Sequence, residues 1–259
     1  MVSFTGSTRA GKQVGAIASQ SIKRLALELG GKSSSVVLDD ADLTKAIKGT
    51  LSSCFLNSGQ TCLAHTRLLI PENKYDEAKT IILAAVEKMK IGDPFVEGTR
   101  LGPVISSAQR DRIQSFISTA KNEGAEVITG QQEIPHELLS GYFVQPTVLG
   151  RVRPNDTVAQ EEIFGPVLSI ITYKDEVEAI EIANNTIYGL GGGVWSNDSH
   201  RAMQFARQMR TGQVDINGAP FNTLAPFGGY KQSGNGREYG IHGFKEFFEI
   251  KSIQQEIQK

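Results

Sequence analysis

The 259-residue sequence has few of the residues that form cross-linked or metal-centred sites. It contains two cysteines and four histidines, and the histidines show no spacing typical of metal ligands. Two cysteines cannot build a disulfide framework of the kind that holds small secreted domains together. This scarcity excludes a disulfide-rich scaffold and gives no reason to expect a bound metal.

Long hydrophobic runs and an excess of one charge are also missing. No segment approaches the roughly 20 apolar residues that cross a bilayer, and residues 1–15 do not resemble a secretory signal. Lys and Arg total 27 against 28 Asp and Glu, a formal net charge of −1. Such a balance gives no electrostatic reason to expect nucleic acid or an acidic membrane as partner. We therefore expect a cytoplasmic protein.

Short apolar runs rich in β-branched residues alternate with segments of helical periodicity. Strands are predicted at residues 34–38, 67–70, 126–129, 167–173, 192–195 and 213–217. Helices are predicted at residues 42–57, 73–89, 106–123, 176–185 and 198–210. This alternation predicts an α/β fold, with a mostly parallel open sheet and flanking helices.

Two further segments complete the predicted organisation. Residues 218–238 are crowded with Gly, Pro and Asn, and a loop of this length in a compact domain is more often functional than idle. Residues 247–257 alternate well enough to form a final strand. The chain opens on a very short strand that leads into a turn, so we expect it to be part of a longer protein.

The turn from Gly6 to Lys12 has the spacing of a phosphate-binding loop. Gln13, however, stands where that loop needs Ser or Thr to hold magnesium, which argues against a nucleoside triphosphatase. A glycine turn that opens a helix still presents backbone N–H groups suited to a pyrophosphate. On spacing alone, a plain strand-to-helix turn is the simpler interpretation.

Two reactive side chains lie beside glycine turns. Cys62 follows Gly59, which ends the preceding helix, and a cysteine at a helix N-terminus would have a lowered pKa. Burial as a small apolar residue is the alternative, and it is the interpretation for Cys54 in mid-helix. Glu28 precedes two glycines and could act as a general base through a water, or be a solvated acid at a helix end. His65 lies too close to Cys62 in sequence to orient easily as its partner.

Five segments together resemble the aldehyde dehydrogenase superfamily in their order and approximate spacing. They read FTGSTRAGK, ELGGKS, FLNSGQTC, EEIFGPV and PFGGYKQSGNGREYG. The resemblance implies that residues 32–232 form the catalytic domain, with residues 1–31 as the end of a dinucleotide-binding domain. Residues 233–259 would then form a return segment and a strand that joins an intersubunit sheet.

The resemblance also implies a reaction. Cys62 matches the catalytic nucleophile, which attacks the aldehyde and later carries a thioester, and its backbone N–H would supply half of an oxyanion hole. Glu28 matches the base that activates water to hydrolyse this thioester. Glu238 matches an acid that relays protons away from the base in some members. The presence of Glu28 favours hydrolysis to a free acid over transfer to coenzyme A.

The cofactor implied is NAD or NADP. The residues that would contact its pyrophosphate, its nicotinamide and the nicotinamide ribose are Gly6, Ser7, Gly11, Leu29, Gly30, Glu162 and Phe164. Phe221 and Phe227 resemble aromatic residues that line the tunnel for the aldehyde substrate. The full-length parent is expected to be a homo-oligomer.

Family members are nearly twice as long as this chain. We therefore expect the chain alone to oxidise aldehydes poorly or not at all. Two alternatives stay open from the residues: a thiol esterase that uses Cys62 and Glu28 without a cofactor, and a truncated module without catalytic activity.

Overall fold

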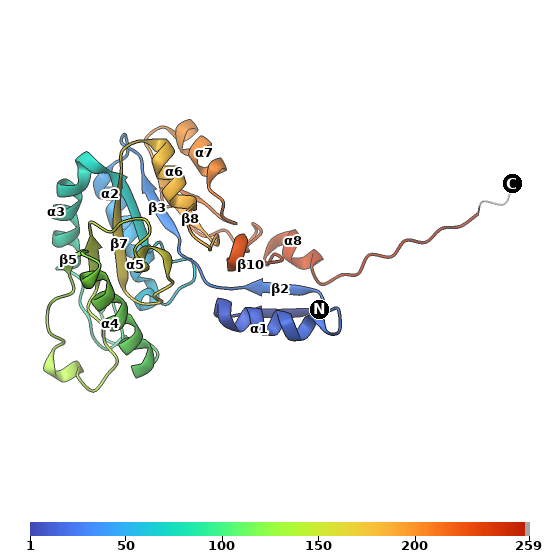
Figure 1. Ribbon diagram of the computed structural model, residues 1–259, viewed down its shortest axis with the longest axis horizontal. Helices are drawn as coiled ribbons and strands as arrows, with labels where there is room; N and C mark the ends of the chain where they lie inside the picture. Colours follow the sequence, from blue (N-terminus) through green and yellow to red (C-terminus); the bar gives the residue numbers. More distant parts are fainter. Residues whose placement is uncertain (257–259) are drawn as a thin grey trace.

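A seven-stranded sheet forms the larger part of the molecule, and a smaller three-stranded sheet lies beside it (Figure 1). The computed structural model describes residues 1–256. The strands of the large sheet, in spatial order, are β5 (Glu126–Thr129), β6 (Thr147–Gly150), β7 (Val167–Tyr173), β4 (Arg67–Pro71), β3 (Ser34–Val37), β8 (Gly192–Trp195) and β9 (Asp215–Ile216). Every neighbouring pair is parallel except β5 with β6. The predicted α/β fold with a mostly parallel sheet is confirmed.

Helices cover both faces of the large sheet. They are α2 (Leu43–Phe55), α3 (Tyr75–Val86), α4 (Ser107–Asn122), α5 (Thr157–Gln160), α6 (Glu176–Asn184) and α7 (Ser199–Gln208). The predicted helices agree with five of these to within a few residues, α5 being the one not predicted. Asp42 begins α2 as expected, because its carboxylate accepts a hydrogen bond from the Lys45 N–H at 2.9 Å.

Alternation along the strands divides the core into two layers. Val36 of β3 packs with apolar residues of α4 to α7, whereas its neighbour Val37 packs with residues of α2 and α3. Successive side chains of a strand point to opposite faces, so a strand buried on both faces is apolar throughout. These continuous apolar runs are what made the central strands predictable.

The small sheet contains β1 (Val2–Thr5), β2 (Leu25–Glu28) and β10 (Gly234–Asn235), and α1 (Thr8–Ser19) connects the first two. β1 and β2 are parallel, and β10 pairs with β2 in the antiparallel sense. The sequence did not predict β2. Its residues, Leu-Ala-Leu-Glu, are strong helix formers, but pairing on both sides overrides that local preference.

The C-terminal part differs from expectation. Residues 218–238 are not one structureless loop, since they contain β10 and a short 3₁₀ turn at Lys231–Ser233. Within residues 247–256 no strand forms, and Ile257 lies outside the described residues. A short helix, α8 (Gly240–Lys245), comes before this extended segment, whose Ile250 is fully exposed. A strand needs a paired edge, and residues 247–256 have none within the single chain. That this segment forms a strand by joining an intersubunit sheet stays a prediction.

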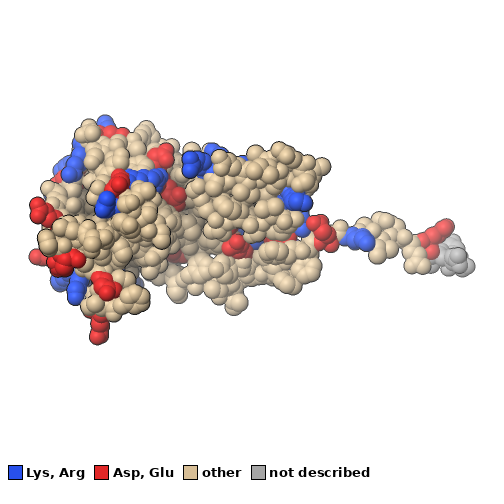
Figure 2. All heavy atoms as spheres, turned by 90° about the horizontal axis from the view of Figure 1, so that it is seen from below, with Lys and Arg blue, Asp and Glu red and all other residues tan. Residues whose placement is uncertain are grey.

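Charged side chains of both signs are interspersed over the face shown in Figure 2. No patch of one sign gathers on this face. No helix within residues 1–256 has the length and apolar character needed to cross a membrane.

The guanidinium of Arg67 joins three segments at the start of β4. Arg67 is 1% exposed. It donates hydrogen bonds to the carbonyl of Lys32 at 3.0 Å and, at the end of α6, to the carbonyls of Ile182 and Ala183, each at 2.8 Å. Removing this side chain would leave the buried Lys32 and Ala183 carbonyls without this donor, whereas the Ile182 carbonyl keeps a hydrogen bond from the Asn185 N–H at 3.3 Å.

We therefore expect Arg67→Met to lower the free energy of unfolding by at least about 2 kcal/mol, since each of the two unsatisfied buried groups costs roughly 1–3 kcal/mol. Urea unfolding followed by circular dichroism measures the effect. Arg207→Met, at an exposed position on α7, is the matched control and should change stability by less than about 0.5 kcal/mol. Equal losses in the two variants would contradict the role assigned to Arg67.

Candidate active site

The residues singled out in the sequence gather at one edge of the large sheet. Glu28 and the two glycines after it precede β3, Cys62 precedes β4, and Glu162 precedes β7. Because β3, β4 and β7 run parallel, their amino ends meet at the same edge. The topology thus brings together three segments that are far apart in the sequence.

Contacts at Gly31 show how closely these segments approach. The Gly31 N–H donates a hydrogen bond to Glu162 Oε1 at 3.0 Å. A methyl group added at Gly31 would lie only 2.4 Å from the Cys62 carbonyl oxygen. Glycine is therefore required here by close packing. The glycine pair that follows Glu28 lies directly between Cys62 and Glu162.

Ser233, which sequence reasoning missed, ties the glycine loop to this edge. Its hydroxyl donates to the Gly30 carbonyl at 2.6 Å and accepts from the Gly189 N–H at 2.9 Å. Its own carbonyl accepts a hydrogen bond from the Leu29 N–H at 2.9 Å. Ser233 is fully buried. The only sequence signal was a small polar residue inside the long glycine-rich segment.

Cys62 is half-buried and lies in a turn that leads into a strand, not at the start of a helix. The expected lowering of its pKa by a helix dipole is wrong. Burial raises the pKa of the Cys62 thiol, and the nearby carboxylates of Glu162 and Glu28 raise it further. The backbone N–H groups of Leu63 and Cys62 act in the opposite direction. These groups can stabilise negative charge at the sulfur.

Glu28 ends β2 and is 4% exposed, so it is not a solvated acid at a helix end. Neither carboxylate oxygen has a hydrogen-bond partner among the described residues. Burial raises the pKa of Glu28 to about 7, with a further increase from Glu238 and a decrease from Arg237. A carboxyl group with such a pKa can exchange a proton near neutral pH.

Two other ionisable side chains, Lys32 and Glu162, lie at this edge. Lys32 is 1% exposed, and its Nζ has no hydrogen-bond partner among the described residues. Burial and the neighbouring Arg67 lower the pKa of Lys32 to about 7. Glu162 is half-buried, and burial raises its pKa although the Gly31 N–H opposes this.

The loop that carries Glu162 is fixed by α4. Arg112 donates from its guanidinium to the Glu162 and Ile163 carbonyls, each at 2.8 Å. The amide of Gln109 donates to the carbonyl of Phe164 at 2.9 Å. Phe164 is half-buried and has a positive φ of 60°.

The N-terminal turn meets the site at Glu28. The Gly6 N–H donates to the Glu28 carbonyl at 3.0 Å, and Ser7 begins α1 by accepting from the Ala10 N–H at 3.2 Å. Gly11 is buried against the side chain of Leu29, where a methyl group would lie 2.4 Å from Leu29 Cδ2. The residues expected at the cofactor thus form one contiguous unit.

Phe221 and Phe227 lie together with Tyr239 in an aromatic cluster. The ring centroids of Phe221 and Phe227 are 5.8 Å apart in an edge-to-face arrangement. The backbone of Phe227 pairs with that of Glu238 through two hydrogen bonds of 2.7 and 2.8 Å. This pairing places Glu238 close enough to Glu28 to raise the pKa of Glu28.

The remaining cysteine and the nearby histidine have other surroundings. Cys54 is fully buried in α2, as expected, and burial raises its pKa to about 12. His65 is buried and faces Asp215, with 3.8 Å between Nε2 and Oδ2.

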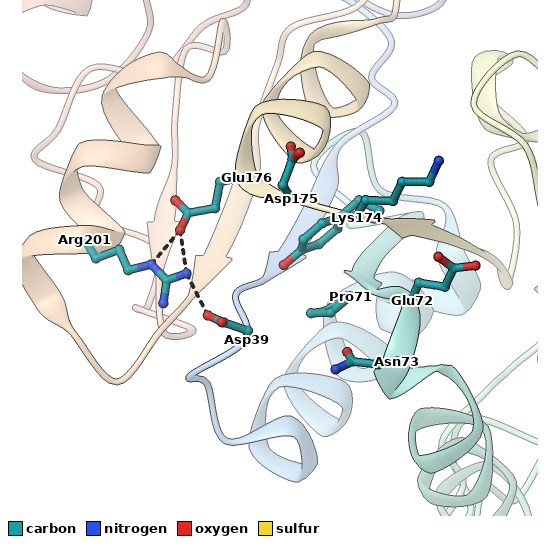
Figure 3. Close-up of a pocket in the computed structure, with 9 residues that line it drawn as sticks. Asp39, Pro71, Glu72, Asn73, Lys174, Asp175, Glu176 and Arg201 are labelled. Atoms are coloured by element: carbon teal, nitrogen blue, oxygen red, sulfur yellow. Dashed lines mark hydrogen bonds and ion pairs between the residues drawn. The ribbon is translucent and has the colours of Figure 1, made fainter.

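A hollow of about 700 Å³ lies at the opposite edge of the sheet, beyond the carboxyl ends of β3, β4 and β7 (Figure 3). There the Arg201 guanidinium contacts Glu176 at 2.7 Å and Asp39 at 2.6 Å. The charge of Arg201 is therefore compensated by two carboxylates of the hollow itself. None of the sequence-predicted site residues lies at this edge.

The comparison with known proteins bears directly on this arrangement. The family model described as the aldehyde dehydrogenase family matches residues 1–253. The chain belongs to the aldehyde dehydrogenase family. It is 49% identical over 253 residues to the 3-succinoylsemialdehyde-pyridine dehydrogenase of a Pseudomonas species, covering 98% of this chain and 53% of that protein.

Solved structures of aldehyde dehydrogenases also match this chain. A mutant aldehyde dehydrogenase C from Pseudomonas syringae, complexed with NAD⁺ and octanal, matches with a TM-score of 0.94 and 42% identity over 96% of this chain and 51% of that one. An aldehyde dehydrogenase from Mycobacterium tuberculosis, complexed with NAD⁺, matches with a TM-score of 0.92 and 43% identity over 95% of this chain and 50% of that one. This chain therefore spans about half the length of these aldehyde dehydrogenases.

The burial of Glu28 generates a prediction about stability. With a pKa near 7 when folded against 4.5 ordinarily, this carboxyl is charged unfavourably in the folded state above pH 7. That cost is absent below pH 4.5 and develops as the pH rises to 7. Glu28→Gln should therefore raise the free energy of unfolding at pH 8 by about 1–2 kcal/mol, after allowance for solvent screening.

Urea unfolding of both proteins at pH 4.5 and pH 8 measures this difference. The gain should be confined to the higher pH. Glu87→Gln, at an exposed position, is the matched control and should show no such gain. A Glu28→Gln variant no more stable than the wild type at pH 8 would contradict the unpartnered burial of this carboxylate.

Proposed function

We propose that the protein containing this chain oxidises an aldehyde to a carboxylic acid with NAD⁺, using Cys62 as nucleophile and Glu28 as general base. The observation that carries the proposal is the buried Glu28 carboxylate, unpartnered among the described residues, at the same sheet edge as the half-buried thiol of Cys62. Family membership and the NAD⁺ in the structures of relatives support it.

The residues present fit a nicotinamide cofactor. A methyl group added at Gly30 would lie 2.5 Å from Glu162 Oε2, so the backbone leaves a narrow cradle beside that carboxylate. A carboxylate suits the hydroxyl groups of a ribose, as bidentate acceptors do in dinucleotide sites. Glu162 would hold the nicotinamide ribose, Leu29, Gly30 and Phe164 would lie against the ring, and Gly6, Ser7 and Gly11 would lie near the pyrophosphate.

Cys62 carries the covalent part of the reaction. Its thiolate attacks the aldehyde carbonyl carbon and forms a carbon–sulfur bond, which converts the carbonyl oxygen into an oxyanion. The backbone N–H of Cys62 would donate a hydrogen bond to this oxyanion. When bound, the nicotinamide of NAD⁺ accepts the hydride from this carbon, which leaves a thioester on Cys62.

Glu28 acts in the hydrolytic half. Its carboxylate accepts a proton from a water molecule, whose oxygen attacks the thioester carbonyl. The carbon–sulfur bond then breaks, which releases the free acid and returns Cys62 to its thiolate form. With a pKa near 7, Glu28 is partly deprotonated at neutral pH and can pass its proton on. Glu238 is the neighbouring carboxylate that could receive it.

Two further expectations remain predictions. One is that the full-length parent is a homo-oligomer, and the exposed apolar side chains of Phe247, Ile250 and Ile253 support it. The other is a cytoplasmic location.

Ester hydrolysis is the second candidate activity, because Cys62 and Glu28 both belong to this chain and neither step needs a cofactor. With p-nitrophenyl acetate, Cys62 should be acetylated with release of one equivalent of p-nitrophenolate, followed by slower turnover. The turnover rate should rise with pH through an inflection near 7 as Glu28 loses its proton. Absorbance at 400 nm records the burst and the steady state.

Three variants test the assignments. Cys62→Ser should abolish the burst, and Cys54→Ser, which removes the other cysteine, should keep it. Glu28→Gln should keep the burst but slow turnover by about 10²-fold or more and remove the inflection. NADH formation with an aldehyde separates oxidation from simple ester hydrolysis. A burst that persists in Cys62→Ser would contradict the proposal.

A further inference from the structure

A cavity of about 340 Å³ lies beside the candidate nucleophile. Thr61 and Leu63, the two neighbours of Cys62, both line it, and Phe221 lies on another side. This volume is at the lower end of those found for small-molecule sites. The cavity is therefore placed to receive the part of a substrate that extends away from a carbonyl group at Cys62.

Its polar lining includes the pair His65 and Asp215. Asp215 lies on β9 opposite Gly193 of β8. The absence of a side chain at Gly193 makes room for the imidazole, since a methyl group there would lie 2.9 Å from His65 Cε1. The His65 ring is thus fixed between two strands and lines the cavity together with Asp215.

The negative charge of Asp215 is only partly compensated. Oδ1 accepts a hydrogen bond from the amide of Gln213 at 2.9 Å. Oδ2 is 3.8 Å from His65 Nε2, which is too long for a hydrogen bond. Burial lowers the pKa of His65, although Asp215 opposes this. The side chain of Asp215 is 26% exposed and accessible from the cavity.

We propose that this cavity binds the distal end of the aldehyde, and that Asp215 selects substrates which carry a cationic group, such as an alkylammonium, at that end. The inference rests on the proposed function. It goes further by assigning a substrate class and a specificity residue.

The surroundings of Asp215 favour a cation over an anion or a purely apolar group. Among the described residues that line the cavity there is no Lys or Arg, and Asp215 is the only one that carries a full charge. The other lining residues are mostly apolar, which weakens solvent screening of the carboxylate. Phe221 adds an aromatic ring, and aromatic rings attract alkylammonium groups.

A pair of thiol reagents of the same shape tests the proposal with the 259-residue chain. One is 2-(trimethylammonio)ethyl methanethiosulfonate, and the other is its neutral isostere, 3,3-dimethylbutyl methanethiosulfonate. Each places its bulky end next to the sulfur that it modifies. Rates at Cys62 are read by mass spectrometry in a Cys54→Ser background, and the cationic-to-neutral ratio is divided by the same ratio for free 2-mercaptoethanol.

We expect this normalised ratio to be about tenfold in the parent chain and to fall by about threefold or more in Asp215→Asn, because a carboxylate in a partly dry site attracts a cation strongly. A residual preference for the cation is expected from Glu28 and Glu162, which also lie near Cys62. Asp215→Glu keeps the charge and should retain most of the preference. Asp76→Asn, on the exposed surface of α3, should leave the ratio unchanged. Circular dichroism confirms that each variant is folded.

Two failures are distinguishable. A Cys62 that neither reagent modifies in the folded chain overturns the proposed function and this inference with it. A Cys62 that reacts readily, with the same normalised ratio in the parent chain and in Asp215→Asn, overturns the cationic specificity alone.

Discussion

The buried guanidinium of Arg67 is the contact on which the candidate site most depends. It fastens the start of β4 to the Lys32 carbonyl, just before β3, and to the end of α6. Cys62 lies in the segment that leads into β4, and the glycine pair after Glu28 lies in the segment just before Lys32. Because three carbonyls converge on one planar group, the loops cannot move apart without leaving buried acceptors unsatisfied. The buried guanidinium of Arg67 thereby fixes the distance between the segments that carry Cys62 and Glu28, the two residues proposed to act in catalysis.

Burial at this edge acts on each ionisable group in the direction that removes its charge. It raises the pKa of Glu28 and of Cys62, and it lowers the pKa of Lys32. The proposed base is thus brought near neutral pH, while the thiolate is made harder to form. Glu28 also disfavours the thiolate directly, so protonation of the base and ionisation of the nucleophile support each other. Burial of these groups lowers the free energy of unfolding, and it also brings the pKa values of Glu28 and Lys32 to about 7.

Much of the fold could be predicted from the sequence. Strands buried on both faces, such as β7, were predictable because their apolar runs are continuous. Glycine turns drew attention to Cys62 and Glu28, but only the resemblance to the aldehyde dehydrogenase superfamily assigned them catalytic roles, and those roles stay predictions. β2 could not be predicted, since its pairing is decided by β1 and β10, which are distant in sequence. The surroundings of Cys62 were also misjudged, because a turn before a strand and a turn before a helix look alike locally. Ser233 gave almost no local signal.

His65 shows why distance along the chain is a poor guide to chemistry. It lies three residues from Cys62, yet its ring faces Asp215 across the β8–β9 edge. β4, which begins just after His65 at Arg67, fixes the backbone on that side of the histidine, and the space left by Gly193 makes room for the ring. The histidine is therefore held away from a role as partner of the nucleophile. It forms instead part of the lining of the neighbouring cavity, beside the Asp215 carboxylate for which we propose a role in substrate selection.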